Sequence, residues 1–127
     1  MKNLFTLTLL LLAYIASAQK IVISEIMYNP PEAGDDTLEY FEITNLTPNE
    51  FKLAGCVITK GVEGNFEDDD VIAPFGYFVC VKKLSAFNAT FPGVAAKQWK
   101  NGALSNSGEA IEISDAQGNV LTSVTYG

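Results

Sequence analysis

A run of consecutive carboxylates, residues 67–70, holds the side chains of this sequence that are best suited to chemistry. Ca²⁺ takes about six to eight oxygen ligands, and a flexible loop with adjacent carboxylates can supply them. The spacing differs from that of an EF-hand, whose ligands alternate around a glycine. Acidic runs are usually solvated, so the pattern favours a solvated acidic loop, and our alternative hypothesis is a low-affinity Ca²⁺ site at Asp68, Asp69 and Asp70.

Two cysteines, Cys56 and Cys80, form the second group with possible chemistry. An even number of cysteines in an exported protein permits one disulfide, which would contribute about 3 kcal/mol by closing a loop. In the run 76–82, every second residue from Tyr77 onward forms the more apolar face, and Cys80 lies on the other face. That pattern predicts an outward Cys80. Two buried thiols that pack as small hydrophobic groups are the alternative to the disulfide.

The composition excludes several other kinds of site. The chain has 127 residues, with eight basic and 15 acidic side chains, a formal net charge of −7, and neither histidine nor arginine. Without histidine it lacks a Ser-His or Cys-His nucleophile pair and an imidazole metal ligand. Without arginine it lacks a bidentate group for phosphate or guanine, and an acidic chain repels a polyanion. We expect no nucleic-acid partner.

The N-terminal residues predict export. Lys2 precedes an apolar stretch at 4–15, and small residues at 16–18 complete the pattern of a secretory signal peptide that is cleaved after Ala18. The stretch is shorter than the roughly 20 residues that cross a bilayer, so we expect no membrane span after cleavage. We therefore expect a signal peptide at 1–18 and one secreted or cell-surface domain at 19–127, with a net charge of −8 once Lys2 is removed.

The rest of the sequence predicts an all-β domain, because short β-rich runs alternate with glycine, proline, asparagine and aspartate and no helical period lasts three turns. The strands are expected at 20–27, 38–45, 51–53, 56–60, 76–82, 110–114 and 119–125. About seven short strands in a domain of this size are typical of an immunoglobulin-like β-sandwich. The last two should form a hairpin, whereas 88–107 should be a loop with one short strand near 97–100, where Trp99 covers the core.

Alternation in the second strand assigns roles to its side chains. Phe41 and Ile43 should face the core, whereas Tyr40 and Glu42 lie on the alternate face. For Glu39 and Glu42 we predict a solvated face that prevents edge aggregation, with a binding role as the alternative.

The aromatic side chains Tyr28, Tyr40, Phe75 and Tyr77 are predicted to pack in the core or at edges. Their alternative role is a face that binds protein or stacks on sugars. A glycosidase site would need two carboxyl groups about 5–10 Å apart in a cleft, and a sandwich of this size has little room for one. We therefore expect no catalysis.

Six short motifs follow one another along the chain. They are Ile23-Ser24-Glu25-Ile26-Met27-Tyr28-Asn29-Pro30, Glu39-Tyr40-Phe41-Glu42-Ile43-Thr44-Asn45, Leu53-Ala54-Gly55, Ala73-Pro74-Phe75-Gly76-Tyr77, Leu104-Ser105-Asn106-Ser107-Gly108-Glu109 and Val124-Thr125-Tyr126-Gly127. This series resembles the lamin tail domain in its bacterial secreted form. The resemblance implies an immunoglobulin-like sandwich without a catalytic site. Cys56 stands where an aromatic residue commonly follows the Leu-x-Gly turn, and the basic surface through which lamin tails meet DNA has no counterpart.

These observations favour a non-enzymatic secreted or cell-surface module for interaction or adhesion, which binds protein or another extracellular polymer. Two alternatives stay open. One is the N-terminal accessory domain of a larger exported hydrolase of nuclease or phosphatase type. The other is a Ca²⁺-dependent carbohydrate-binding domain that uses Asp68, Asp69 and Asp70. No cofactor other than this Ca²⁺ is expected, and the sequence leaves the oligomeric state open.

Overall fold

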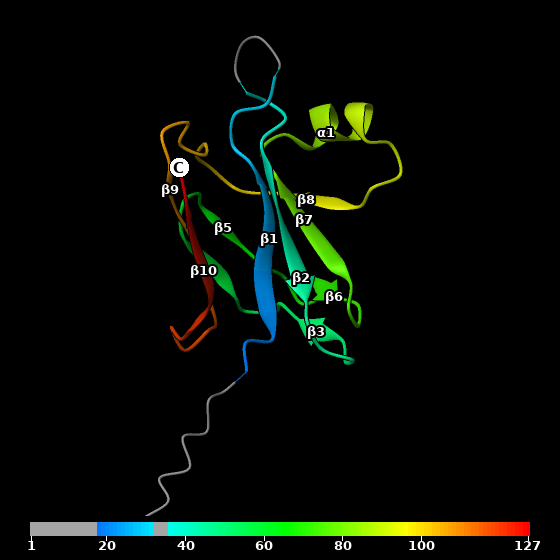
Figure 1. Ribbon diagram of the computed structural model, residues 1–127. Helices are drawn as coiled ribbons and strands as arrows, with labels where there is room; N and C mark the ends of the chain where they lie inside the picture. The colour runs from blue at the N-terminus through cyan, green and yellow to red at the C-terminus, as the bar shows by residue number, and fades with distance from the viewer. Residues whose placement is uncertain (1–17, 32–35) are drawn as a thin grey trace, which may run out of the picture.

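The computed structural model describes residues 18–31 and 36–127 (Figure 1). The predicted signal peptide, apart from Ala18, lies outside these residues. The strands are β1 (Ile21–Met27), β2 (Tyr40–Asn45), β3 (Phe51–Lys52), β4 (Val57–Lys60), β5 (Gly64–Asn65), β6 (Val71–Ile72), β7 (Tyr77–Val81), β8 (Ala96–Gln98), β9 (Glu109–Ser114) and β10 (Val120–Tyr126), and the helix is α1 (Leu84–Thr90). The protein is thus built mostly of β-strands, as predicted.

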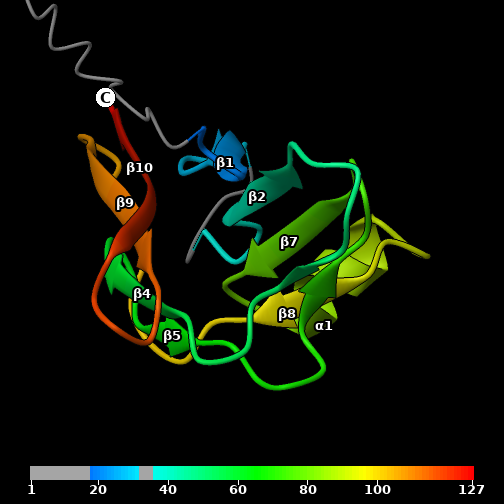
Figure 2. The same ribbon diagram turned by 90° about the horizontal axis from the view of Figure 1, so that it is seen from below.

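Two four-stranded sheets face each other across the core. The first sheet has the strand order β1-β2-β7-β8 and the second has the order β10-β9-β4-β5, while β3 and β6 form a small separate pair. Figure 2 shows the two layers from below, with α1 outside the first sheet. The hairpin predicted at 110–125 is confirmed, because β9 and β10 are antiparallel and joined by a tight turn. The arrangement agrees with an immunoglobulin-like sandwich.

The core is formed by alternate side chains of both sheets. Phe41 and Ile43 are fully buried, as the alternation in β2 predicted, and they share one core cluster with Ile111 and Ile113 of β9 in the other sheet. Trp99 is also buried, as expected, and its ring stacks on that of Phe41 with 6.1 Å between the centroids. Aromatic stacking of this kind contributes about 0.5–1.5 kcal/mol beyond the area it buries.

The helix α1 was not predicted, because 88–107 was interpreted as a loop and no element was expected at 83–87. Its origin lies in the topology: β8 pairs with β7 in parallel, and a parallel pair needs a crossover connection of a dozen or so residues. The chain from 82 to 95 makes this crossover along the outer face of the first sheet, where α1 packs Phe87 against Val79 and Val81. The N-cap residue Lys83 makes no side-chain cap, but the N–H of Leu84 donates to the side-chain oxygen of Gln98 on β8 at 2.8 Å. This hydrogen bond and the packing of Phe87 together hold the helix.

The prediction that Cys80 points outward is wrong. Cys80 lies in the main core, whereas Val79 and Val81 on the other face of β7 are buried beneath α1. Both faces of this strand are therefore covered, and the more apolar one faces the helix. Alternation gives the correct face only when the other face meets water, because polarity then distinguishes the two.

Candidate functional site

The acidic loop at 67–70 is held by internal contacts. A carboxylate oxygen of Asp70 accepts a hydrogen bond from the backbone N–H of Glu67 at 2.8 Å and also contacts the ammonium group of Lys97 on β8. Burial tends to lower the pKa of Lys97, but the hydrogen bond and charge of Asp70 raise it above its ordinary value. Asp68 and Asp69 are exposed in the turn between these contacts.

Lys97 therefore supplies the positive charge that faces Asp70. Within the described residues, no three aspartate, glutamate, cysteine or histidine side chains come together as ligands of one metal ion. Calcium binding at Asp68, Asp69 and Asp70 stays a prediction. Calorimetry with millimolar Ca²⁺ tests it, and a response in the wild type that persists after Asp69→Asn would count against this loop.

The two cysteines are separate thiols in this structure, and both are buried. Burial raises the pKa of the Cys56 thiol, with a further contribution from the charge of Asp115, and burial likewise raises the pKa of Cys80 well above its usual range. A thiol whose pKa is raised forms little thiolate and reacts slowly. The arrangement corresponds to the alternative of two buried thiols, which pack as core residues.

Glu39 is buried, so the prediction of a solvated side chain is wrong for this residue. Its carboxylate is only 1% exposed. One oxygen accepts a hydrogen bond from the backbone N–H of Leu104 at 2.9 Å, and the other lies 3.6 Å from Nζ of Lys82. Burial raises the pKa of Glu39, although the bond from Leu104 and the charge of Lys82 act in the opposite direction. This carboxylate attaches the loop before β9 to the edge of the core.

Glu42 lies on the outer face of the first sheet, where it takes part in a set of polar contacts with β1. Its carboxylate accepts a hydrogen bond from the hydroxyl of Ser24 at 2.8 Å. Next to it, the hydroxyl of Tyr40 donates to a carboxylate oxygen of Glu25 at 2.6 Å. Two carboxylates from neighbouring strands are therefore presented on the same face of the sheet.

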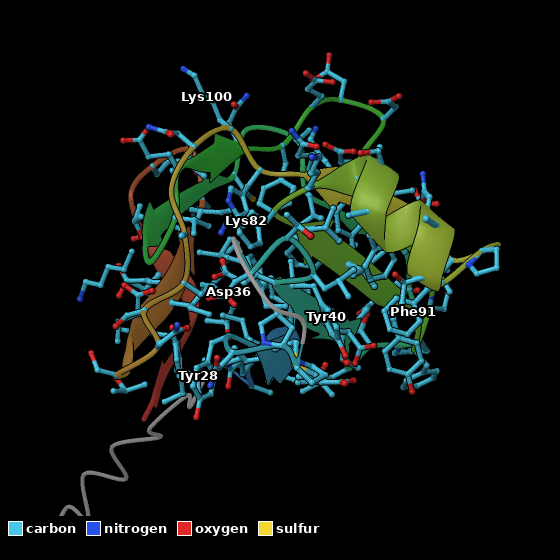
Figure 3. The ribbon with its side chains drawn as sticks, turned by 90° about the horizontal axis from the view of Figure 1, so that it is seen from above. Tyr28, Asp36, Tyr40, Lys82, Phe91 and Lys100 are labelled. Atoms are coloured by element: carbon cyan, nitrogen blue, oxygen red, sulfur yellow. The ribbon has the colours of Figure 1, made fainter. Side chains whose placement is uncertain are left out.

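A small groove lies where these carboxylates meet the helix. It has a volume of about 160 Å³ and is lined by Glu25, Tyr40, Glu42, Val79, Phe87, Phe91 and Val94. We call it the aromatic groove. Strands β1 and β2 supply its polar side, β7 supplies Val79, and α1 with the residues after it supplies the apolar side. Figure 3 shows Tyr40 and Phe91 next to each other beside the helix.

Three rings give this groove its shape. The centroids of Tyr40 and Phe87 are 5.8 Å apart and those of Tyr40 and Phe91 are 6.3 Å apart, both in edge-to-face arrangements. Phe87 and Phe91 are tilted against each other at 5.0 Å. Phe87 is buried and packs against the rings of Tyr40 and Phe91, so it fixes their position. Phe91 is 41% exposed and reaches solvent.

The electrostatic environment of the aromatic groove is negative. No lysine lines it, and within the described residues neither Glu25 nor Glu42 forms an ion pair. The pKa of Tyr40 is raised to about 12, first by burial, then by its hydrogen bond to Glu25 and by the charges of Glu25 and Glu42. A site with two uncompensated carboxylates and apolar walls suits a ligand that is cationic at one end and apolar along its length.

A larger depression of about 800 Å³ lies between the N-terminal segment, the turn before β4 and the first half of β10. The carboxylate of Asp115 in its wall accepts hydrogen bonds from the backbone of the hairpin turn, at Gln117 and Asn119. Cys56 is buried in the wall, and its raised pKa keeps it protonated. Asp115 and Cys56 thus serve the fold.

The aromatic groove was not predicted from the sequence. Leu84, Phe87 and Phe91 repeat at i, i+3 and i+7, a spacing that is compatible with an apolar helix face but is too short to predict α1 alone. Tyr28 and Tyr40 pack as predicted.

For Phe75 and Tyr77 the packing prediction is wrong, because both side chains are exposed. They lie at the end of the sheet that α1 does not cover.

Comparison with protein families gives a match to the lamin tail domain over residues 15–127. This range includes every strand of both sheets and the helix of the groove. A comparison with curated proteins gave no match. In the part of the chain that the structure describes, no helix has the length and apolar character needed to cross a membrane.

Proposed function

Because the chain belongs to the lamin tail domain family, we propose that it is a non-enzymatic interaction module, secreted or attached to the cell surface, and that a segment of a protein partner docks in the aromatic groove. Export rests on the signal peptide predicted at 1–18. The docking site rests on the outer face of the first sheet, where the helix leaves part of the sheet uncovered.

The observation that carries this proposal is the exposed apolar lip of the groove. Phe91 is 41% exposed and Val94 is 44% exposed, and both line the groove together with buried Phe87 and Val79. Contiguous exposed apolar side chains with a polar rim are typical of protein interaction sites. Aromatic residues that fill such pockets commonly dominate the free energy of binding.

The size of the groove supports a protein segment over a small-molecule substrate. Pockets for small molecules have about 300–1,000 Å³, whereas this groove has about 160 Å³. Its two carboxylates are each hydrogen bonded to a hydroxyl group, Glu42 to Ser24 and Glu25 to Tyr40. One inserted side chain fills such a space, and the neighbouring strands and helix would contact the rest of the segment.

Selection of binding peptides from a displayed random library tests the proposal. Peptides enriched on the wild-type domain should lose at least tenfold in affinity for Phe91→Ala, because the lip loses most of its apolar area. Tyr77→Ala is the matched control, since Tyr77 is 66% exposed on the same face of the sheet but outside the groove. Peptides that bind Phe91→Ala as well as the wild type would overturn the docking site.

A further inference from the structure

We propose that the side chain taken up by the aromatic groove is a lysine of the partner protein, with its methylene stem along the apolar side and its ammonium group between the rings and the carboxylates of Glu25 and Glu42. This inference rests on the proposed function, because it names the chemistry of the segment that docks there.

The volume of the groove fits a lysine side chain. The groove has about 160 Å³, well below the roughly 300–1,000 Å³ of small-molecule pockets, which suits one extended side chain. A lysine side chain has five non-hydrogen atoms beyond Cα. An arginine side chain has seven, four of which form a rigid planar head that is wider than a lysine stem. A sugar ring with its hydroxyl groups is wider than a lysine stem as well.

The walls match the two ends of that side chain. Val79, Phe87 and Val94 offer an apolar surface to four methylene groups. The ring of Phe91 is 41% exposed at the groove, so a cation beside the carboxylates can lie within the roughly 6 Å over which a ring face attracts it. Edge-to-face packing of Tyr40 on both phenylalanines keeps the rings in place before the ligand arrives.

Charge favours a cation over a neutral side chain of the same shape. Glu25 and Glu42 lack ion pairs within the described residues, and the groove has no lysine of its own. Each carboxylate accepts a single hydroxyl hydrogen bond and keeps further acceptor sites. The formal net charge of −7 attracts a basic segment from a distance and orients its approach.

Three matched peptides test the inference: acetyl-Gly-Gly-X-Gly-Gly-amide with lysine, norleucine or arginine at X. The readout is the shift of backbone amide resonances in ¹⁵N-labelled protein. The lysine peptide should shift amides at Tyr40, Glu42 and Phe91 and bind at least fivefold more tightly than norleucine, because one such cation contact is worth roughly that factor. Affinities in the millimolar range are expected for a single side chain.

Charge-neutral variants identify the groups responsible. Glu25→Gln combined with Glu42→Gln should bring the affinity of the lysine peptide to that of norleucine, whereas Glu50→Gln, an exposed control outside the groove, should leave it unchanged. The spectra of the free variants also report whether they are folded. Raising NaCl from 0.05 to 0.5 M, values chosen to shorten the screening length from roughly 14 to 4 Å, should weaken the lysine peptide and spare norleucine.

The outcomes separate this inference from the proposed function. Equal affinities for the lysine and norleucine peptides would overturn the proposal that the groove binds lysine, but would leave the proposed docking function unaffected. Tighter binding of arginine at the same amides would overturn it too. Shifts confined to amides outside the groove would overturn the lysine site, and only selected peptides that ignore Phe91→Ala would overturn the docking function itself.

Discussion

Truncation of Glu39 to alanine should reveal how much the buried carboxylate contributes to the fold. The side chain is 1% exposed, and the residue directly precedes β2, beside the loop that leads to β9. Its removal leaves the buried N–H of Leu104 without its acceptor and the ammonium group of Lys82 without this partner. Both losses act on the native state, so the free energy of unfolding should fall.

The magnitude follows from these contacts. A buried N–H that loses its acceptor costs about 1–3 kcal/mol. The lost methylene adds about 0.8 kcal/mol. The side chain of Lys82 is 25% exposed and can turn toward water, which limits the penalty of its unpaired charge. We expect a total loss of about 3 kcal/mol, equivalent to a fall in Tm of roughly 12 °C for a domain of this size.

Glu39→Gln separates the hydrogen bond from the charge. The amide oxygen of glutamine can still accept the bond from Leu104, and burial raises the pKa of Glu39, which means that burial disfavours its charged form. The glutamine variant should therefore lie within about 1 kcal/mol of the wild type. Urea unfolding at neutral pH measures all three proteins, and Glu42→Ala, on the opposite face of β2, should cost less than about 1 kcal/mol.

Two results would refute this reasoning. If the alanine variant lost less than about 1 kcal/mol, the bond to Leu104 would contribute little to the attachment of the loop. If the glutamine variant lost as much as the alanine variant, the negative charge itself would stabilise the native state. The pKa of Glu39 would then have to be lowered in the folded protein.

The remaining predictions concern pH, thiols, glycine and the helix. Because the pKa of Glu39 is raised, the native state binds the extra proton, and the stability of the wild type relative to Glu39→Gln should fall as pH rises from about 4 through the raised pKa; a rise would contradict the burial effect. A thiol reagent should label neither cysteine in the native protein and both in unreduced urea, whereas a disulfide would leave both unlabelled. Gly108→Ala places Cβ 2.4 Å from a backbone oxygen of β10 and should cost more than about 2 kcal/mol in urea unfolding, against about 1 kcal/mol for Gly118→Ala, where φ is also positive but nothing lies within 4 Å. Phe87→Ala should cost about 3–5 kcal/mol by the same measurement and exposed Phe91→Ala less than half of that; equal costs would mean that the two rings are equally buried.

Local alternation was sufficient to predict the longer strands of the sandwich. Phe41 and Ile43 in β2, like Ile111 and Ile113 in β9, are fully buried at the positions that the period of two selects. The ends of these strands differ from the predicted ones by one or two residues. The two-residue strands β5 and β6 were not predicted as strands, because two residues are too few for an alternation to show.

The position of Glu39 could not be predicted by weighing its charge alone. It shares the alternation of Phe41 and Ile43, so the pattern places it on the core side, but an isolated carboxylate is expected to seek water. The group that makes its burial tolerable is the N–H of Leu104, which lies 65 positions away in the sequence. Only the assembled fold brings donor and acceptor together.

The helix escaped prediction for a related reason. Its apolar spacing at Leu84, Phe87 and Phe91 spans two turns, and so short a pattern does not distinguish a helix from a loop. The parallel pairing of β7 with β8 requires the crossover, and that pairing is a contact between distant segments. The aromatic groove is formed partly by the helix, so it could not be predicted from the sequence either.

The aromatic groove owes its mixed character to incomplete coverage of one sheet face. Along β7 the helix covers Val79 and Val81, whereas Tyr77 at the start of the strand is 66% exposed. On the neighbouring strands the same face carries Glu25 and Glu42, whose contacts with hydroxyl groups belong to a surface that meets water. The groove lies at the boundary between these two regions, so apolar rings and charged carboxylates adjoin within a space of about 160 Å³. A purely apolar ligand would remove water from the carboxylates without replacing it, and a small cation would leave the rings in contact with water. A lysine side chain meets both requirements at once, because its stem is apolar and its end is charged.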